Sequence, residues 1–591
     1  MGEGKALVMG DDTRSFLAIV RSLGRRGIDV HVAPSDFTSP ALTSRYISRV
    51  HYLPPWPVSE AGWNDALETL LRTEHFDLVI PSSDLTLLPL QKQRERFGAL
   101  AKLAIPDDRS IAALFDKQAT RELAQSVGAP VAAGGPALST DDAGEVFARL
   151  GSPVVLKPRR SYAVENLEVR GQVRICESPA ALQALLPRIR EGEYFYEAFF
   201  PGRGAGVSVL ASRGRILQAF EHHRVREDQS GSYYRVSVAP TPALHACCAA
   251  MVAALDYTGI AMFEFRLGPV ANEWILLEVN ARPWGSMPLP VSLGVDFPYR
   301  WYQLLVNGTE TPPVAYRAGM YGRNLVPDLY STMADMKARW AAAPVVAARR
   351  VGEIGRVLAG RERQDTLVLD DAAPGLRELR SLGAGVAGRL ARAGRLERLV
   401  PARRYFVHSA TQRRLRRALE AEGNGPITLV MVCQGNICRS PFAAAMLEQA
   451  LREQALAGSG AGGGAAGRNI VVRSAGLLPR SGRRTPQFGI EAAGALGVDL
   501  QAHRSMFLSR EDAEAASAIL IFDDVNQQWI ARRYPRLATA VVKLGHFAPL
   551  DDWIDDIADP IDRDLAFYTS TYDAIARSAA GLAAIVEAAL R

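Results

Sequence analysis

Apolar runs and amphipathic segments alternate along the first part of the chain. The run 5–9 ends in turn residues, the segment 16–25 has a helical pattern, and a second apolar run follows at 28–32. A strand, a helix and another strand in this order favour a parallel β-sheet with crossover helices. With a further strand expected at 76–80, this part of the chain is predicted to be an α/β domain.

Glycine-rich phosphate motifs are missing from this region. No Gly-x-Gly-x-x-Gly sequence follows the first strand, and the chain contains no Gly-x-x-x-x-Gly-Lys-Ser/Thr loop. Neither a dinucleotide site nor a Walker-type nucleotide site is therefore expected. Asp84 follows the strand at 76–80 in a polar loop, where a functional role and a helix cap are equally reasonable interpretations.

Polar residues stand on apolar strands between residues 153 and 282. Lys157 closes one apolar run, Glu264 stands inside another, and Glu278 and Asn280 lie two residues apart in a third. Residues two apart on a strand share a face, so Glu278 and Asn280 point the same way. Oxygen ligands on neighbouring strands suit Mg²⁺, which is often shared with phosphates. We therefore predict a magnesium site at Glu264, Glu278 and Asn280.

Residues from about 1 to 315 resemble the ATP-grasp superfamily, in the style of the carbamoyl-phosphate synthetase large chain and other carboxylate–amine ligases. The resemblance rests on these stretches: Asp116-Lys117, Val155-Leu156-Lys157-Pro158, Glu197 to Phe200, Glu264, and Glu278-Val279-Asn280-Ala281-Arg282. It implies an α/β multidomain architecture, with a Rossmann-like pre-ATP-grasp domain at 1–105 and an α+β ATP-grasp domain at 106–315. It also implies an enzyme that uses ATP and Mg²⁺ to join a small carboxylate to a small amine, without identifying either substrate.

The same resemblance implies roles for the matched residues. Lys117 and Lys157 are expected to contact the phosphates of ATP, and Arg282 is expected to meet the acyl phosphate or its carboxylate precursor. The implied magnesium ligands are again Glu264, Glu278 and Asn280. The stretch that looks like the hinge for the adenine ring is Glu197, Ala198, Phe199 and Phe200.

The segment 316–425 carries no recognisable catalytic constellation, and arginine becomes its dominant charge. Leu396, Leu399 and Val400 follow a helical spacing, which predicts a short amphipathic helix. A basic surface of this kind could contact anionic lipid. A solvated helical spacer is the favoured interpretation, and the segment is predicted to be a basic helical connector.

An apolar run at 427–431 leads into Cys433-Gln434-Gly435-Asn436-Ile437-Cys438-Arg439-Ser440-Pro441 and then into a helical pattern at 442–454. A helix N-terminus presents unpaired N–H groups and the positive end of the dipole, so this loop is suited to an anion. Cys433 is expected to be a thiolate nucleophile there. Arg439 can grip two phosphate oxygens with its planar guanidinium group. The Cys-x5-Arg-Ser pattern therefore predicts a phosphatase.

Residues 426–591 resemble the low-molecular-weight protein tyrosine phosphatases over their whole length. Besides the loop, the matching stretches are Arg473-Ser474-Ala475-Gly476, Gly497-Val498-Asp499-Leu500, His503-Arg504 and Asp559-Pro560. The resemblance implies a flavodoxin-like domain with a four-stranded parallel sheet. It also implies that Asp559 is the general acid, a group that the chemistry requires in order to expel a phenolate.

The implied mechanism needs no metal. Cys433 would attack phosphorus and form a phosphocysteine, while Arg439 and the loop amides hold the phosphate oxygens. Ser440 would donate a hydrogen bond to the thiolate, and Asn436 would fix the loop. Asp559 would first donate a proton and then activate water. The substrate is expected to be a phosphotyrosine protein, because Ile437 stands where phosphoarginine-specific relatives carry threonine.

Some neighbouring residues keep two interpretations. Cys438 is either a small buried residue or a partner that forms a reversible disulfide with Cys433. Tyr568 and Tyr572 either flank the site or belong to the core and surface of the last helix, and the second interpretation is favoured. The Gly/Ala-rich stretch 455–467 is predicted to be a flexible loop.

The composition sets the context for both predicted activities. With 48% hydrophobic and 22% charged residues, the chain resembles an ordinary globular protein. A net charge of +6 without a recognisable nucleic-acid motif gives no reason to expect a nucleic-acid partner. Five cysteines are too few for a disulfide framework, and neither a secretory leader nor a membrane-spanning apolar run is recognisable. A reducing cytoplasm is the expected location.

These observations predict a bifunctional cytoplasmic enzyme, an ATP-grasp ligase fused to a protein tyrosine phosphatase. The alternative is a tyrosine phosphatase regulated by a non-catalytic ATP-binding front end. The joint presence of Lys157, Glu264, Glu278 and Asn280 favours catalysis, because a sensor does not need a complete magnesium set.

Overall fold

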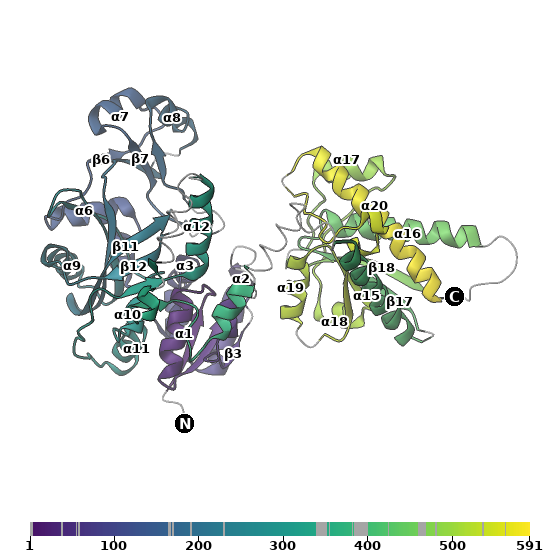
Figure 1. Ribbon diagram of the computed structural model, residues 1–591, viewed down its shortest axis with the longest axis horizontal. Coiled ribbons are helices and arrows are strands. Elements are labelled where there is room, and N and C mark those ends of the chain that lie inside the picture. Colours follow the sequence, from purple (N-terminus) through teal and green to yellow (C-terminus); the bar gives the residue numbers. More distant parts are fainter. Residues whose placement is uncertain are drawn as a thin grey trace. The chain divides into compact units, whose positions relative to one another are not determined.

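The computed structural model contains two compact units, Met1–Gly383 and Ala384–Arg591 (Figure 1). It describes residues 4–36, 39–51, 53–54, 56, 60–162, 167, 171–189, 192–228, 231–338, 352–353, 355–380, 382, 400–423, 425–458, 469–478, 481–534, 537–561 and 563–590. Within these residues no helix is both long and apolar enough to cross a membrane.

A five-stranded parallel sheet begins the first unit. Its strands, in spatial order, are β3 (Arg49–Val50), β2 (Asp29–Ala33), β1 (Lys5–Met9), β4 (Leu78–Pro81) and β5 (Lys102–Leu103). The helices between them are α1 (Ser15–Arg25), α2 (Glu60–Glu74), α3 (Asp84–Lys92) and α4 (Arg94–Gly98). Val8 and Val30 pack in one core cluster with residues of α1, whereas Leu7 and Met9 pack in another with residues of α2. Because successive strand residues face opposite sides, both faces of the sheet are buried. The predicted α/β domain with a parallel sheet is confirmed.

A smaller antiparallel sheet follows in the same unit. Its order is β6 (Gly134–Pro136), β9 (Tyr194–Ala198), β7 (Val154–Pro158) and β8 (Arg174–Cys176). The elements that pack on it are α7 (Ala143–Leu150), α8 (Pro179–Gln183) and η2 (Leu186–Arg188), whereas α5 (Asp108–Leu114) and α6 (Lys117–Ser126) precede it and pack in the core of the next sheet. Figure 1 shows α7 and α8 at the outer end of the unit, together with β6 and β7.

A seven-stranded sheet completes the first unit. Its order is β14 (Trp274–Asn280), β13 (Gly259–Leu267), β10 (Arg203–Ser212), β11 (Arg215–Asp228), β12 (Gly231–Ser237), β15 (Tyr321–Arg323) and β16 (Glu362–Gln364). Its helices are α9 (Pro242–Ala254), α10 (Pro288–Ser292), α11 (Phe297–Asn307) and α12 (Leu325–Ala338). In the antiparallel pair β13–β14, Glu264 lies opposite Glu278 and Met262 lies opposite Asn280. The sheet register therefore brings the three predicted magnesium ligands together.

The second unit has a four-stranded sheet in the order β18 (Ile470–Gly476), β17 (Ile427–Cys433), β19 (Ala518–Ile521) and β20 (Ala540–Lys543), with every pair parallel. This sheet confirms the prediction for the phosphatase domain. Its other elements are α15 (Val400–Ala421), α16 (Arg439–Gly458), α17 (Gln487–Ala495), α18 (Arg510–Ala515), α19 (Asp524–Arg533), η4 (Leu544–Phe547), η5 (Leu550–Asp552) and α20 (Leu565–Leu590).

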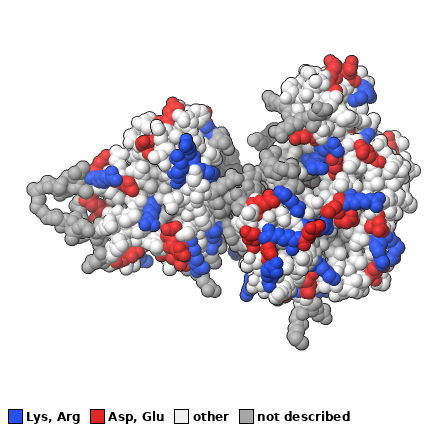
Figure 2. Space-filling model, turned by 180° about the vertical axis from the view of Figure 1, so that it is seen from behind, with Lys and Arg blue, Asp and Glu red and all other residues white. Residues whose placement is uncertain are grey.

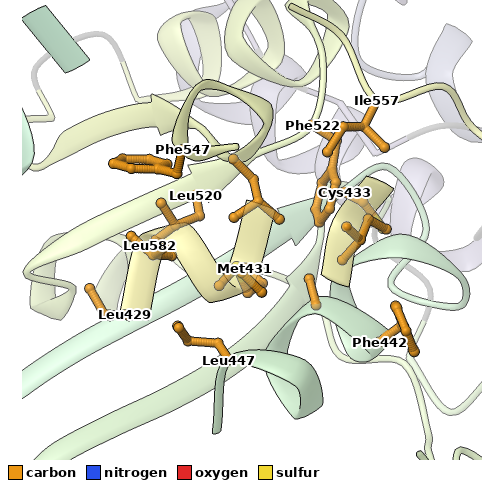
Figure 3. Packing of buried hydrophobic residues seen from close by; sticks show 14 of the residues in the cluster. Leu429, Met431, Cys433, Phe442, Leu447, Leu520, Phe522, Phe547, Ile557 and Leu582 are labelled. Carbon is orange, nitrogen blue, oxygen red and sulfur yellow. The ribbon is translucent and has the colours of Figure 1, made fainter. Parts of the chain in front are cut away.

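The core of the second unit follows the two-residue period of β17. Leu429 and Met431 pack on one face with Phe442 of α16 and Leu582 of α20, as Figure 3 shows. Val430 and Val432, which alternate with them, belong to a separate core cluster. Both faces of the central strand are buried, as expected for a parallel sheet covered by helices on both sides.

The segment 316–425 is divided between the two units. Its strands β15 and β16 extend the seven-stranded sheet of the first unit, whereas α15 belongs to the second. Leu415 and Leu419 on α15 are fully buried in the same core cluster as Leu429. The predicted spacer role of this segment does not describe α15, because a solvated spacer would not bury these side chains. Leu396 and Leu399 of the predicted amphipathic helix lie outside the described residues. Of the predicted loop 455–467, residues 455–458 continue helix α16, and residues 459–467 lie outside the described residues.

Buried ion pairs attach Asp365 and Asp371, near the end of the first unit, to β12 and α1. Arg235, whose side chain is fully buried, donates to both carboxylate oxygens of Asp365 at 2.6 and 3.0 Å. Arg21 of α1 donates to Asp371 at 2.8 Å. Among the residues that the structure describes, Figure 2 shows charges of both signs interspersed on the side of each unit that is in view.

Candidate active sites

The loop after β17 is held by Asn436. This residue is fully buried and has a positive φ of 51°, which asparagine tolerates better than most side chains. Its side-chain amide donates to Ser440 Oγ and to Ser474 Oγ, both at 3.0 Å, and its Oδ1 accepts from the backbone N–H of Met506 at 2.7 Å. Every hydrogen-bonding group of the Asn436 amide thus has a protein partner, which fixes the loop conformation.

Cys433 stands at the end of β17 with its sulfur inside this loop. The side chain is 3% exposed, its Sγ lies 3.0 Å from Ser440 Oγ, and it accepts from the backbone N–H of Asn436 at 3.3 Å. The backbone N–H of Asn436 thus points at the sulfur, while the Ser440 hydroxyl also donates to the carbonyl of Ala475 at 3.2 Å. The predicted contact between Ser440 and Cys433 is therefore present.

Arg439 begins α16 and connects the loop to a distant part of the chain. Its Nη2 donates to Asp559 Oδ2 at 2.7 Å, and its Nη1 donates to Asp523 Oδ2 at 2.6 Å and to the carbonyl of Ile557 at 2.8 Å. Burial opposes the charge of this 1% exposed residue, but Cys433, Asp559 and Asp523 outweigh burial and raise the pKa of Arg439. The fold therefore places a cation beside Cys433 and brings Asp559 to the same place.

Two residues at this site were not predicted from the sequence. Asp523 caps α19 by accepting from the N–H of Asn526 at 2.7 Å and also binds Arg439. Arg483 donates from Nη2 to the carbonyl of Gly435 at 2.7 Å. The sequence shows Asp523 only as a residue before a helix, and no local pattern reports its distant partner.

Cys438 and the tyrosines near it belong to the core. Cys438 is buried with its Sγ 3.4 Å from Tyr568 Oη, and burial raises the pKa of its thiol to about 12. Tyr572 is fully buried, stacks on Phe442 with ring centroids 4.0 Å apart, and donates to the carbonyl of Cys438 at 3.1 Å. Both tyrosines are core residues and neither is a surface one, and both also contact Cys438 in the loop, so the two interpretations are not exclusive.

A cavity of about 270 Å³ in the first unit gathers several of the residues predicted there. Four of them line it: Lys117, Glu278, Asn280 and Arg282. Its other polar lining residues are Asp84, Gln91, Asp108, Asp116, Arg160, Ser161 and Tyr162. Its apolar lining comes mainly from α3, α5 and the residue after α5: Leu88, Ile111, Ala112, Leu114 and Phe115.

The carboxylates of Glu264 and Glu278 face each other beside one amide. Asn280 Nδ2 donates to Glu264 Oε1 at 3.1 Å and to Glu278 Oε1 at 3.4 Å. Burial raises the pKa of Glu264; nearby Arg224 opposes that shift, and the charge of Glu278 adds to it. Burial acts the same way on Glu278, but Lys117, Lys157 and Arg282 outweigh it and lower the pKa. Two facing carboxylates fit a hard divalent cation such as Mg²⁺, and the Asn280 amide, which here turns its nitrogen toward them, would offer its oxygen after rotation of the amide group.

The two predicted phosphate-binding lysines already have acidic partners. Lys117 follows the N-cap residue of α6, and its Nζ lies 3.5 Å from Glu278 Oε2 and 3.3 Å from Ser161 Oγ. Lys157 forms an ion pair with Glu197, which is 5% exposed. Glu197 therefore directs its side chain at a cation, whereas Phe199 in the same stretch is 42% exposed.

Arg282 has an aspartate partner across the cavity. Its Nε donates to Asp84 Oδ1 at 2.7 Å, and this ion pair raises the pKa of Arg282 against the effect of burial. Ser83, not Asp84, occupies the N-cap position of α3. Of the two interpretations of Asp84, the structure therefore supports a place beside the candidate site.

A further cluster in the first unit has the residue types of a metal site. His31 Nδ1 lies 2.8 Å from His51 Nε2 and 3.8 Å from Glu74 Oε2. However, Glu74 also forms ion pairs with Lys5 and, at 2.7 Å, with Arg49. The carboxylate is thus already neutralised by two cations, and the cluster is better described as a partly buried polar network.

Comparisons with known proteins agree with the geometry of the second unit. The family model described as low molecular weight phosphotyrosine protein phosphatase matches residues 428–591. A probable low molecular weight protein-tyrosine-phosphatase EpsP of Ralstonia nicotianae is 31% identical over 150 residues, which cover 25% of this chain and 89% of that protein. A protein-arginine-phosphatase of Geobacillus stearothermophilus is 29% identical over 148 residues, or 25% of this chain and 88% of that protein.

Other matches are to ligases and carboxylases. A D-alanine–D-alanine ligase of a Synechococcus species is 29% identical over 153 residues, which cover 24% of this chain and 45% of that ligase. Among solved structures, the biotin carboxylase domain of 2-oxoglutarate carboxylase from Hydrogenobacter thermophilus is similar, with 15% identity and a TM-score of 0.44. That likeness covers 54% of this chain and 73% of the carboxylase chain.

The EpsP relative matches this chain along most of its own length, and the family model spans β17 to α20, where Cys433, Arg439 and Asp559 meet. Through residues 428–591, the chain belongs to the low molecular weight phosphotyrosine protein phosphatase family.

Proposed function

We propose that the protein is a bifunctional enzyme, in which an ATP- and Mg²⁺-dependent carboxylate–amine ligase precedes a protein tyrosine phosphatase. The observation that carries the phosphatase half is the convergence of Cys433, Arg439 and Asp559. The thiol and the carboxylate come from opposite ends of the matched region, yet both lie beside one buried guanidinium group.

In the proposed first step, Cys433 Sγ attacks phosphorus and the ester oxygen leaves with a proton from Asp559. The substrate phosphate replaces Asp559 as the partner of Arg439 Nη2, so the carboxyl group becomes available to the leaving oxygen. In the second step Asp559 accepts a proton from water, whose oxygen attacks phosphorus, and the S–P bond breaks. A general acid of this kind contributes roughly 10² to 10⁴ in rate.

The expected substrate is a phosphotyrosine protein. Ile437 supports this choice because it presents an apolar side chain at the loop, partly buried against the core cluster. The matched relatives include proteins described as tyrosine and as arginine phosphatases. A phosphotyrosine peptide and its phosphoarginine counterpart, compared at equal concentration, decide between the two substrates. Faster hydrolysis of the arginine peptide would contradict the proposal.

For the first unit, the cavity around Arg282 supports a ligase. Glu264, Glu278 and Asn280 would hold Mg²⁺, which would neutralise phosphate charge, and Lys117 and Lys157 would contact the phosphates of ATP. The substrate carboxylate would bind Arg282 and be converted to an acyl phosphate with release of ADP. Attack by an amine on the acyl carbon would then form the amide and release phosphate.

The lining of the cavity suggests what the substrates share. Asp108, which also accepts from Arg94 Nε at 3.0 Å, provides a carboxylate for an ammonium group, whereas Leu88, Ile111 and Phe115 provide apolar surface. A cavity of about 270 Å³ suits small molecules. We therefore propose small carboxylates and amines of which at least one has an apolar part.

The alternative is a phosphatase regulated by an ATP-binding front end without ligase activity. Two ion pairs favour this alternative, that of Lys157 with Glu197 and that of Glu264 with Arg224. In them, the proposed phosphate-binding lysine and one proposed magnesium ligand already have protein partners. Both proposals are tested by measuring ADP release with a panel of small acids and amines. ADP formation that requires both an acid and an amine supports the ligase, whereas ATP binding without ADP release supports the sensor.

A further inference from the structure

Helix α15 lies outside the residues matched by the phosphatase family, yet it is built into the phosphatase unit. The match begins at residue 428, whereas α15 spans Val400–Ala421. Leu415 and Leu419 are fully buried in the core cluster that contains Cys433. The family domain in this chain is thus extended by one helix, and the contacts of that helix indicate what it does.

The polar side of α15 holds the imidazole ring of His546 on η4. Thr411 Oγ1 lies 3.1 Å from His546 Nδ1, and His408 Nδ1 lies 2.8 Å from the carbonyl oxygen of His546. The ring also stacks on Trp553, with centroids 5.1 Å apart and planes inclined by 15°. These contacts fix both the position and the orientation of the His546 ring.

The other nitrogen of His546 reaches the stretch 555–559, which ends in Asp559 and is called the acid segment below. His546 Nε2 lies 3.0 Å from Asp555 Oδ1. Because one ring nitrogen meets α15 and the other meets Asp555, a neutral ring that donates to Asp555 accepts from the Thr411 hydroxyl. His546 therefore connects helix α15 to the acid segment.

Further contacts hold the acid segment to the rest of the phosphatase unit between Asp555 and Asp559. Lys543, which is 7% exposed, donates to Asp556 Oδ1 at 2.7 Å. The N–H of Ile557 donates to the carbonyl of Phe522 at 2.8 Å, and its own carbonyl accepts from Arg439 at 2.8 Å. Asp555 is held from two sides, because Lys543 Nζ lies 3.6 Å from the same Oδ1 that His546 contacts, and the histidine contact is the one that involves α15.

We propose that Thr411 and His546 are positioning residues for Asp559. They hold the beginning of the acid segment, so that the carboxyl group at its end reaches the leaving oxygen of the substrate. Proton transfer requires hydrogen-bond distance, and a displacement of about 1 Å can cost on the order of 10² in rate. This inference rests on the proposed role of Asp559 as general acid.

The test compares two substrates that need the acid to different extents. The leaving group of phenyl phosphate is a basic phenolate, whose departure needs a proton. The leaving group of para-nitrophenyl phosphate is a much less basic phenolate, so its departure depends less on protonation. Thr411→Val removes the hydroxyl contact to His546 with little change in shape. We expect kcat/KM for phenyl phosphate to fall roughly tenfold and that for para-nitrophenyl phosphate to fall by less than about threefold.

Thr569→Val is the matched control. Thr569 is exposed on α20, and its hydroxyl donates to the carbonyl of Leu565 in its own helix at 3.0 Å. This variant should leave kcat/KM for both substrates unchanged. His546→Gln, which keeps a donor for Asp555, should retain more phenyl phosphate activity than His546→Ala.

A second background separates this inference from the mechanism on which it rests. Asp559→Asn alone should show the same selective loss, larger than that of Thr411→Val, and adding Thr411→Val to it should cost nothing further. If Asp559→Asn shows no selectivity between the substrates, the proposed mechanism fails. If Asp559→Asn is selective, but Thr411→Val lowers kcat/KM equally for both substrates or for neither, the positioning role alone is overturned.

Discussion

Among single residues, Arg439 determines what the loop after Cys433 can bind. Its guanidinium group is buried at 1% exposure and joins two aspartates from separate segments. A buried charge is tolerated only with partners, and an anionic ligand can replace one of them. A phosphate that displaces one aspartate therefore meets a buried cation beside Cys433.

Arg439→Lys should keep the charge and lose the activity. Lysine offers a compact ammonium group in place of a planar fork, so it cannot bind two phosphate oxygens and reach Asp523 as well. We expect kcat/KM for para-nitrophenyl phosphate to fall roughly 10² to 10³-fold, as when one preorganised donor is removed. Arg510→Lys, at an exposed position, is the control. Activity within a few fold of wild type would contradict the assigned role.

His51 should make the first unit sensitive to acid. Burial and the neighbouring His31 lower the pKa of His51 to about 4, from an ordinary value of 6.5. The unfolded chain therefore binds more protons between these values, so the stabilising effect of the neutral ring is lost as the pH falls from 6.5 towards 4. Thermal unfolding of His51→Gln should depend less steeply on pH in this window. His75→Gln, at an exposed position, should keep the wild-type slope.

At the scale of elements, α15 shows how far sequence patterns reach. The arginines of the segment 316–425 suggested a solvated helix, and most of the charged residues on α15 are indeed exposed. The signal that the helix is part of a core was the pair Leu415 and Leu419, four residues apart. A pair of this kind is too short to distinguish a packed helix from a solvated one.

Leu419→Ala should therefore destabilise the phosphatase unit. The side chain is fully buried, and replacing a buried leucine with alanine costs about 2 to 5 kcal/mol. Denaturant unfolding, monitored through the loss of phosphatase activity, measures this change. Leu550→Ala, at a position that is 39% exposed, should cost much less. Equal stability of the two variants would mean that α15 is a spacer after all.

At the scale of the whole molecule, features that depend on short stretches of sequence could be predicted, whereas pairs of residues far apart in the sequence could not. The Cys433 loop and the parallel sheets were predictable because motif spacing and strand periodicity are properties of short stretches. Asp523 at Arg439 and the pair of Arg235 with Asp365 were not, because the residues that meet are far apart in the sequence. The strand pattern suggested that Glu264 and Glu278 stand on neighbouring strands, but it did not give the register that sets one opposite the other.

The two candidate sites lie in separate units with separate cores, so their activities should be separable. Glu278→Gln should abolish ADP release with the acid and amine substrates while leaving para-nitrophenyl phosphate hydrolysis unchanged. Cys433→Ser should do the reverse. If Glu278→Gln instead alters the phosphatase rate only when ATP is present, the regulatory alternative is favoured over the ligase.

The most direct test of the account is the position of the phosphoryl group during turnover. Asp559→Asn should slow hydrolysis of the intermediate, because the base that activates water is missing. After mixing with para-nitrophenyl phosphate, whose leaving group depends less on protonation, without added metal and quenching, mass spectrometry should find one phosphoryl group on the sulfur of Cys433. A phosphoryl group on another residue, or unchanged turnover in Cys433→Ser, would contradict the account.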